Sequence, residues 1–150
     1  MADPAPVLPV RVRLLRPGAQ LPLRATDGAT GLDIYACPPG GGPLEIGPDP
    51  VLVPTGIALE VPPGYDAQVR PRSGLAKMGV LAVFGTLDSD YRGELFITMH
   101  TVGGRGPHTV RSGDRIAQLV IAPLASVVLV QVATLSPTQR GAGGHGSTGA

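Results

Sequence analysis

The chain has 150 residues, a length that suits one domain with a substantial hydrophobic core. Its 12 basic and 11 acidic residues leave a formal charge of +1, so no overall field favours nucleic acid or an anionic membrane as a partner. The single cysteine, Cys37, excludes a disulfide within the chain and indicates a reducing compartment.

The N-terminal half carries the patterns of short strands. Residues 1–6 are small or proline-broken, and we expect them to be flexible. Apolar and basic residues alternate within residues 7–15, as in a half-buried strand. Closely spaced prolines and glycines then disfavour a helix and predict strands at residues 44–46, 51–53 and 56–61.

The wider composition agrees with short strands joined by turns. Apolar residues make up 43% of the chain and aromatic residues only 3%, so Val, Leu, Ile and Ala must build the core. With 22 glycines and 17 prolines regular structure is interrupted often, but the apolar fraction is too high for a disordered chain. No apolar run approaches the roughly 18 residues of a membrane span. The first residues also lack a charged region followed by an apolar core, so we expect a cytoplasmic protein.

Asp33 is the first candidate functional residue in chain order. It lies in GLDIYA, where the apolar residues Leu32, Ile34 and Ala36 recur at every second position. This period places Asp33 on the opposite side of a strand from Leu32 and Ile34. An outward-facing strand residue is the simplest explanation of that position.

The segment AQVRPRSGLAKMG contains the best place for a short helix. The residue before a proline is pushed out of the helical region, so the stretch around Pro71 is extended. A helix then fits residues 73–78, with Ser73 near its start. Its backbone N–H groups and the guanidinium of Arg72 could together seat an anion. An ordinary capped helix with a surface arginine explains the pattern equally well.

The stretch GTLDSDYRGEL, residues 85–95, places two carboxylates, a phenol and a guanidinium at one bend between glycines. Strands are predicted on both sides of it, at residues 80–84 and 95–101. A carboxylate in such a bend can act as a general base toward water. A solvated hairpin turn is the competing interpretation, because Asp, Ser and Gly are ordinary turn residues.

The C-terminal third starts with RSGDRIAQLVIAPL, where Gln118 lies among apolar residues. A buried glutamine needs partners for its amide, so Gln118 is either a satisfied core amide or a ligand of substrate or water. Pro123 then ends this strand. The apolar residues 127–132 that follow are exposed unless they pair with another sheet.

The tail QRGAGGHGSTGA is too rich in glycine to pack a core. Its backbone N–H groups, together with Arg140 and the hydroxyls of Ser147 and Thr148, could cradle a phosphate. It lacks the Gly-Lys-Ser/Thr ending and the following helix of the common phosphate-binding loop. A flexible glycine-rich terminus is the alternative.

Five stretches, in order, resemble the trimeric dUTPase family: ATDGATGLDIYA, PRSGLA, GTLDSDYRGEL, GDRIAQLV and RGAGGHGSTG. The resemblance spans almost the whole chain. It implies an all-β, jelly-roll-like fold with one short helix, and one domain over residues 1–150. It also implies a homotrimer whose active sites lie at subunit interfaces, with C-terminal strand exchange after a hinge at Pro123. Residues 136–150 would form a flexible arm that closes over the active site.

The implied reaction is Mg2+-dependent hydrolysis of dUTP to dUMP and pyrophosphate, with water attacking the α-phosphorus. It would keep dUTP low and supply dUMP for dTMP synthesis. Magnesium prefers oxygen ligands and retains waters, so few direct protein ligands would be needed.

By position in the motifs, the resemblance implies that Asp88 orients and deprotonates the attacking water. Tyr91 would lie under the deoxyribose and exclude a 2′-hydroxyl. Asp33 would steady waters around Mg2+, and Gln118 would contact phosphate or ordered water. The remaining implied substrate-binding residues are Arg72, Ser73 and Gly74 for the phosphates, Val83, Gly85, Thr86 and Leu87 for the uracil edge, and Arg140, Gly144, His145, Gly146, Ser147 and Thr148 in the arm.

Two departures from the family pattern concern uracil recognition. His145 stands where a phenylalanine commonly stacks on uracil, so stacking would be weaker and would depend on pH. The segment 78–87, which holds the expected base-reading hairpin, is short, and the chain contains no Asn.

Three other functions compete with this interpretation. A dCTP deaminase shares the fold but needs a glutamate positioned at the base and a different arginine-serine motif. A trimeric binding or regulatory module would have lost the acid, phenol or phosphate ligands, yet Asp88, Tyr91, Arg72 and Ser73 are present. A protein-built metal site is disfavoured, because three scattered histidines and one cysteine form no ligand cluster in the sequence.

Overall fold

The computed structural model describes residues 7–144 and is built almost entirely of antiparallel strands. The helical elements of this part are α1 (Ser73–Lys77) and the single 3-10 turn η1 (Pro39–Gly41). The strands are β1 (Arg11–Leu14), β2 (Leu32–Tyr35), β3 (Leu44–Ile46), β4 (Val51–Glu60), β5 (Tyr65–Arg70), β6 (Val80–Ala82), β7 (Gly85–Leu87), β8 (Glu94–Thr101), β9 (His108–Val110) and β10 (Arg115–Pro123). The prediction of an all-β fold with one short helix is confirmed.

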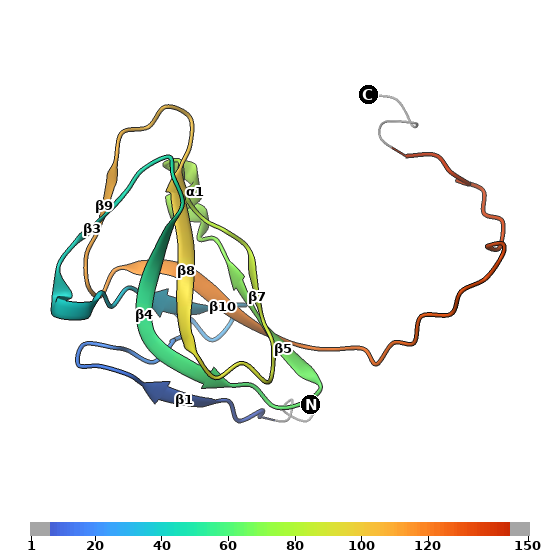
Figure 1. The fold of residues 1–150 in the computed structure, drawn as a ribbon, viewed down its shortest axis with the longest axis horizontal. Helices are drawn as coiled ribbons and strands as arrows, with labels where there is room; N and C mark the ends of the chain where they lie inside the picture. Colours follow the sequence, from blue (N-terminus) through green and yellow to red (C-terminus); the bar gives the residue numbers. More distant parts are fainter. Residues whose placement is uncertain (1–6, 145–150) are drawn as a thin grey trace.

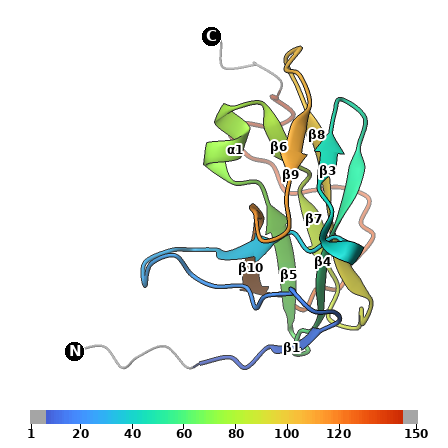
Figure 2. The ribbon, with the colours of Figure 1, turned by 90° about the vertical axis from the view of Figure 1, so that its left-hand side faces the viewer.

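Two four-stranded sheets form the layers of a sandwich. One has the order β1-β4-β8-β6 and the other the order β2-β10-β5-β7, and Figure 2 shows the two layers from the side. A two-stranded ribbon, β3 with β9, lies beside them (Figure 1). The buried residues between the layers are aliphatic, as the composition predicted, and include Ile34, Val53, Ala67, Ile97 and Ile116.

Strand β4 differs from the sequence prediction. The expected strands at residues 51–53 and 56–61 are one strand, whose pairing with β8 shifts between Pro54 and Ala58. Gly56 lies in this bulge with φ of +71°, a left-handed conformation that glycine adopts without a Cβ clash. Pro54 has no N–H to donate to the ladder, and the bulge that follows it bends the strand without ending it. The two predicted pieces therefore continue as one element.

The segment between β6 and β8 also differs from the expected hairpin. Strand β6 pairs with β8, but β7 pairs with β5 in the opposite sheet. The chain therefore crosses from one layer to the other through Val83 and Phe84, and returns through residues 88–93. This crossover places the acidic turn between the two layers at one edge of the sandwich.

Beyond β10 the chain leaves the sandwich. The strand ends at Pro123, as predicted, and the N–H of Leu124 donates a last hydrogen bond to the carbonyl of Gly64. Residues 125–144 then extend away from the body and form no strand (Figure 1). The side chains of Val128 and Leu129 are 85% and 94% exposed. Within residues 7–144, no helix is long and apolar enough to cross a membrane.

Candidate active site

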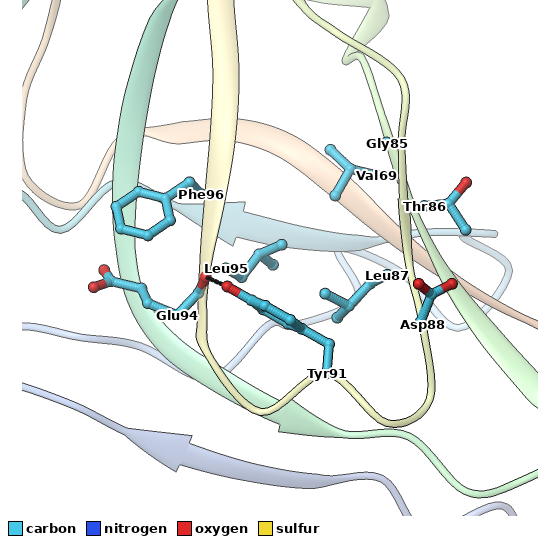
Figure 3. A pocket seen from close by; sticks show the side chains of 9 residues that line it. All are labelled: Val69, Gly85, Thr86, Leu87, Asp88, Tyr91, Glu94, Leu95 and Phe96. Atoms are coloured by element: carbon cyan, nitrogen blue, oxygen red, sulfur yellow. Dashed lines mark hydrogen bonds between the residues drawn. The ribbon is translucent and has the colours of Figure 1, made fainter.

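The crossover turn lines a pocket of about 260 Å³, which we call the turn pocket. It brings together five residues that the sequence analysis singled out: Gly85, Thr86, Leu87, Asp88 and Tyr91 (Figure 3). Its full lining is Val69, Gly85, Thr86, Leu87, Asp88, Tyr91, Glu94, Leu95 and Phe96. Val83, although predicted for the same site, is exposed and lies outside this lining.

Backbone hydrogen bonds shape the turn. The N–H of Tyr91 donates to the carbonyl of Asp88 at 3.1 Å, and the Arg92 guanidinium donates to the carbonyl of Ser89 at 2.6 Å. The Tyr91 hydroxyl donates to the Glu94 carbonyl at 3.0 Å, so the ring folds back across the pocket (Figure 3). A Cβ on Gly93 would overlap the Tyr91 ring, which explains the glycine. The Asp88 side chain is exposed and faces the pocket from the opposite side.

The far end of the turn is anchored by Glu94, the first residue of β8. Its carboxylate accepts two hydrogen bonds from Arg16, at 2.7 and 2.6 Å, and one from the N–H of Gly56 at 2.9 Å. These contacts, that of Arg16 above all, hold the pKa of Glu94 below its usual value, although burial opposes them.

Glu94→Gln should destabilise the protein by about 2 kcal/mol at pH 7, since hydrogen bonds to a charged group contribute about that much. A lowered folded-state pKa gives stability that is present above the unfolded-state pKa, about 4.3, and lost as pH falls through the folded-state value. The difference between wild type and variant in urea unfolding should therefore be smaller at pH 3.5 than at pH 7. Glu60→Gln, in an exposed pair with Arg11, is the control and should show no such pH dependence.

A second pocket, of about 220 Å³, gathers residues from three separate sequence motifs. We call it the guanidinium pocket. Asp33, Arg72, Ser73, Gly74 and Gln118 all line it, as the sequence analysis required for one site. The other lining residues are Ala25, Ala29, Gly31 and Arg115.

Asp33 lies between two guanidinium groups rather than facing solvent. Its Oδ1 accepts a hydrogen bond from Arg72 Nε at 3.2 Å, and its Oδ2 lies 3.5 Å from Arg115 Nη1. Arg72 Nη1 also donates to the backbone carbonyl of Arg115 at 3.1 Å. Two cations with one carboxylate leave this pocket with positive charge, which suits an anionic ligand.

Gln118 connects β10 to the segment that leads into α1. Its Nε2 donates to the carbonyl of Pro71 at 2.9 Å. A Cβ on Gly31 would lie 2.9 Å from the Gln118 Cβ, so a glycine is needed to let this side chain pass. The Gln118 amide is thus partly satisfied by backbone and still lines the pocket.

The remaining predicted residues lie elsewhere. Arg140 is exposed in the extended segment, where its Nε donates to the carbonyl of Gly143 at 2.8 Å, and Gly144 is also remote from both pockets. His145, Gly146, Ser147 and Thr148 lie outside the described residues. Among residues 7–144, no group of three His, Cys, Asp or Glu side chains is placed to hold a metal ion.

Sequence reasoning missed Arg115, Glu94 and Phe96. Arg115 and Glu94 lie inside motifs already noted, GDRIAQLV and GTLDSDYRGEL. A charged residue within such a motif was the signal that could have marked both as candidate site residues. Phe96 is an exposed aromatic residue, 42% accessible, on a strand with alternating burial.

Comparisons with known proteins agree with this arrangement. A family model described as dUTPase matches residues 18–149. The deoxyuridine 5′-triphosphate nucleotidohydrolase of Methylocella silvestris is 47% identical over 156 residues, which cover 100% of this chain and 95% of that protein. The enzyme of the same name from Anaeromyxobacter sp. is 47% identical over 151 residues, which cover 95% of this chain and 99% of that protein.

A solved structure agrees with the fold. The Staphylococcus bacteriophage 80alpha dUTPase with dUPNHPP superposes with a TM-score of 0.79 and 26% identity, covering 95% of this chain and 99% of that chain. The family model and the near-complete relatives together show that this chain belongs to the dUTPase family.

Proposed function

We propose that this chain hydrolyses dUTP to dUMP and pyrophosphate. The observation that carries the proposal is the pairing of two pockets, one with an exposed carboxylate beside a phenol and one with two guanidinium groups. The first suits a nucleoside next to a reacting water, and the second suits a polyphosphate. Pyrophosphate release from dUTP tests the proposal, and release from no nucleotide would contradict it.

Asp88 is the proposed general base. Its carboxylate takes a proton from a water, the water oxygen bonds to the α-phosphorus, and the bond from that phosphorus to the bridging oxygen breaks. Pyrophosphate then leaves with the electron pair. The exposure of Asp88 is consistent with this role, since the carboxylate can reach both water and substrate.

Tyr91 and β7 are proposed to hold the nucleoside. The Tyr91 ring, tethered at its hydroxyl, offers a fixed flat surface for deoxyribose and no room for a 2′-hydroxyl. Strand β7 is at the edge of its sheet, paired only with β5, so its second edge presents backbone donors and acceptors. Uracil can pair with such an edge much as it pairs with another base.

The guanidinium pocket is proposed to bind the phosphates. Arg72 and Arg115 supply charge, while Ser73 and Gly74 supply a hydroxyl and backbone N–H groups. Both Asp33 oxygens already face guanidinium groups, so this carboxylate suits contact with the waters of a Mg2+ ion better than direct ligation. Carried by the triphosphate, Mg2+ would offset negative charge on the pyrophosphate as it leaves.

A homotrimer is proposed as the active form. In one chain the two pockets share no lining residue, so joining them across a subunit interface would complete each site. On β5, Asp66 Oδ1 and Arg70 Nε are buried without a hydrogen-bond partner in the described part of the chain. A second copy packed on this face would supply the missing partners.

The extended C-terminal segment supports strand exchange between copies. A groove of about 1100 Å³ opens between the layers, lined mostly by apolar residues such as Val12, Leu59, Leu119 and Ile121. The exposed apolar residues 127–132 of a neighbouring copy would cover it, which would remove both surfaces from water.

The remaining proposals concern the chain as a whole. Residues 1–150 would form one dUTPase domain, with residues 136–150 as an arm that closes on bound nucleotide and excludes water. The protein would act in the cytoplasm, without nucleic acid or membrane as a partner. There it would keep dUTP low and supply dUMP for dTMP synthesis.

Gly31→Ala should raise KM for dUTP about tenfold with little change in kcat, as expected when binding alone is weakened. The added Cβ displaces Gln118 and thereby the Pro71 carbonyl that precedes the phosphate-binding residues. Gly28→Ala, in the same loop, is the matched control, because a Cβ there meets nothing within 4 Å. Steady-state kinetics of both variants provide the measurement, and equal KM values would contradict the proposed role of Gly31.

A further inference from the structure

Arg16 and Glu94 form the best-shielded ion pair in the described part of the chain. The pair is bidentate, with N–O distances of 2.7 and 2.6 Å, and joins residues 78 positions apart. Their side chains are 23% and 13% exposed, against 82% and 46% for the Arg11–Glu60 pair on β1 and β4. Paired hydrogen bonds between a guanidinium and a carboxylate fix orientation as well as distance.

This pair also contacts two further parts of the backbone. Arg16 Nη1 donates to the carbonyl of Cys37, just after β2, at 3.1 Å. Glu94 Oε1 accepts from the N–H of Gly56 in the β4 bulge at 2.9 Å. A Cβ on Gly56 would lie 3.2 Å from Arg16 Nη1 and 2.8 Å from the Ala19 Cβ, so the glycine leaves room for the arginine. The start of β8 is therefore held by Arg16 and by the bulge of β4.

The same residue, Glu94, holds the Tyr91 ring. The Tyr91 hydroxyl donates to the Glu94 backbone carbonyl, while the Glu94 side chain is held by Arg16 (Figure 3). The position of the ring in the turn pocket thus depends, through Glu94, on Arg16, which does not line that pocket.

We propose that Arg16 is a positioning residue: by clamping Glu94 it sets the position of the Tyr91 ring, and so the selection of deoxyribose over ribose. This inference rests on the proposed dUTP hydrolysis. Without Arg16, a largely buried carboxylate loses its counter-ion and turns toward water, because an unpaired buried charge is costly. The Glu94 backbone shifts with it, and the ring is released from its fixed position.

Arg16→Met keeps an unbranched side chain but removes the guanidinium group with its charge and hydrogen bonds. We expect KM for dUTP to rise about tenfold. The preference for dUTP over UTP, measured as the ratio of their kcat/KM values, should also fall about tenfold. Small misplacements near the reacting groups have effects of this size or more. The kcat for dUTP should stay within about threefold, because Asp88 lies at the other end of the turn. Arg16→Lys, which keeps the charge but loses the bidentate geometry, should recover part of the selectivity. Arg11→Met is the matched control and should behave as wild type.

Hydrogen–deuterium exchange gives a measurement independent of activity. In Arg16→Met, backbone amides of residues 88–94 should exchange at least about fivefold faster, since their local opening becomes easier. Elsewhere exchange should match wild type. The proposal would be overturned if both Arg16 variants kept the selectivity of wild type. Faster exchange spread evenly over the chain, together with that unchanged selectivity, would show that Arg16 serves only overall stability. If wild type did not hydrolyse dUTP, the proposed function would fail, whereas the exchange pattern would still test the positioning of the turn.

Discussion

Asp88→Asn should lower kcat for dUTP hydrolysis by about 10²–10⁴-fold, the range typical for loss of a general base. The amide keeps the size of the side chain but cannot take a proton from water at neutral pH. Nucleotide affinity should remain within about threefold of wild type, because the turn is shaped by the backbone atoms of Asp88 and not by its carboxylate. Stopped-time pyrophosphate assays and calorimetry with a non-hydrolysable dUTP analogue measure the two effects separately.

Asp90→Asn is the matched control for this variant. Asp90 lies in the same exposed turn but is not part of the pocket lining, so its kcat should stay within about threefold of wild type. An Asp88→Asn enzyme with full turnover would contradict the role of Asp88 as base. Equal losses in the two variants would indicate that charge in the turn matters and not proton transfer.

Deletion of the C-terminal segment should also cause a large loss of activity. A chain ending at Leu124 loses residues 127–132, which are proposed to cover the groove of a neighbouring copy. We expect it to be monomeric by light scattering and to lose activity about 10³-fold or more, because the two pockets would no longer meet and positioning can contribute effects of this size. The exposed groove should also make it less soluble.

A chain ending at Leu135 tests the closing of the arm, residues 136–150, separately from the assembly of the trimer. It keeps residues 127–132 and lacks the arm, so it should remain a trimer while kcat/KM for dUTP falls about 10²-fold, as expected when a closing lid is lost. A fully active monomer ending at Leu124 would contradict the shared active site. A fully active trimer ending at Leu135 would contradict only the role of the arm.

Most of the strands and the helix were predictable from the sequence because their signals are local, whereas β7 and β9 were not predicted as strands. Alternation around Ile34 and proline positions around residues 44–61 are properties of neighbouring residues, and α1 follows from Pro71 and the helix formers after it. The bulge of β4 and the transfer of β7 to the other sheet were not predicted. Both are settled by pairing with distant strands, β8 and β5, which no local pattern encodes.

The candidate site was likewise predictable from the sequence only in part. Residues of separate motifs line common pockets, Asp88 with Tyr91 and Arg72 with Gln118, and their roles there stay predictions. Side-chain pairing was not predicted. Asp33 was expected to face outward but pairs with Arg72 and Arg115, because β2 lies against β10 in a register that sets Asp33 opposite Gln118. Arg16, distant from every motif in the sequence, gave no signal of its contact with Glu94.

The most direct test of the proposed function is pyrophosphate release with Mg2+, measured for dUTP, dTTP, dCTP and UTP with one protein preparation. Hydrolysis of dUTP alone is the predicted result, because the tethered Tyr91 ring is proposed to select the sugar and the edge of β7 to select the base. Release of ammonia from dCTP would contradict the proposal in favour of a deaminase. No product from any of the four nucleotides would contradict it in favour of a binding module that keeps the fold.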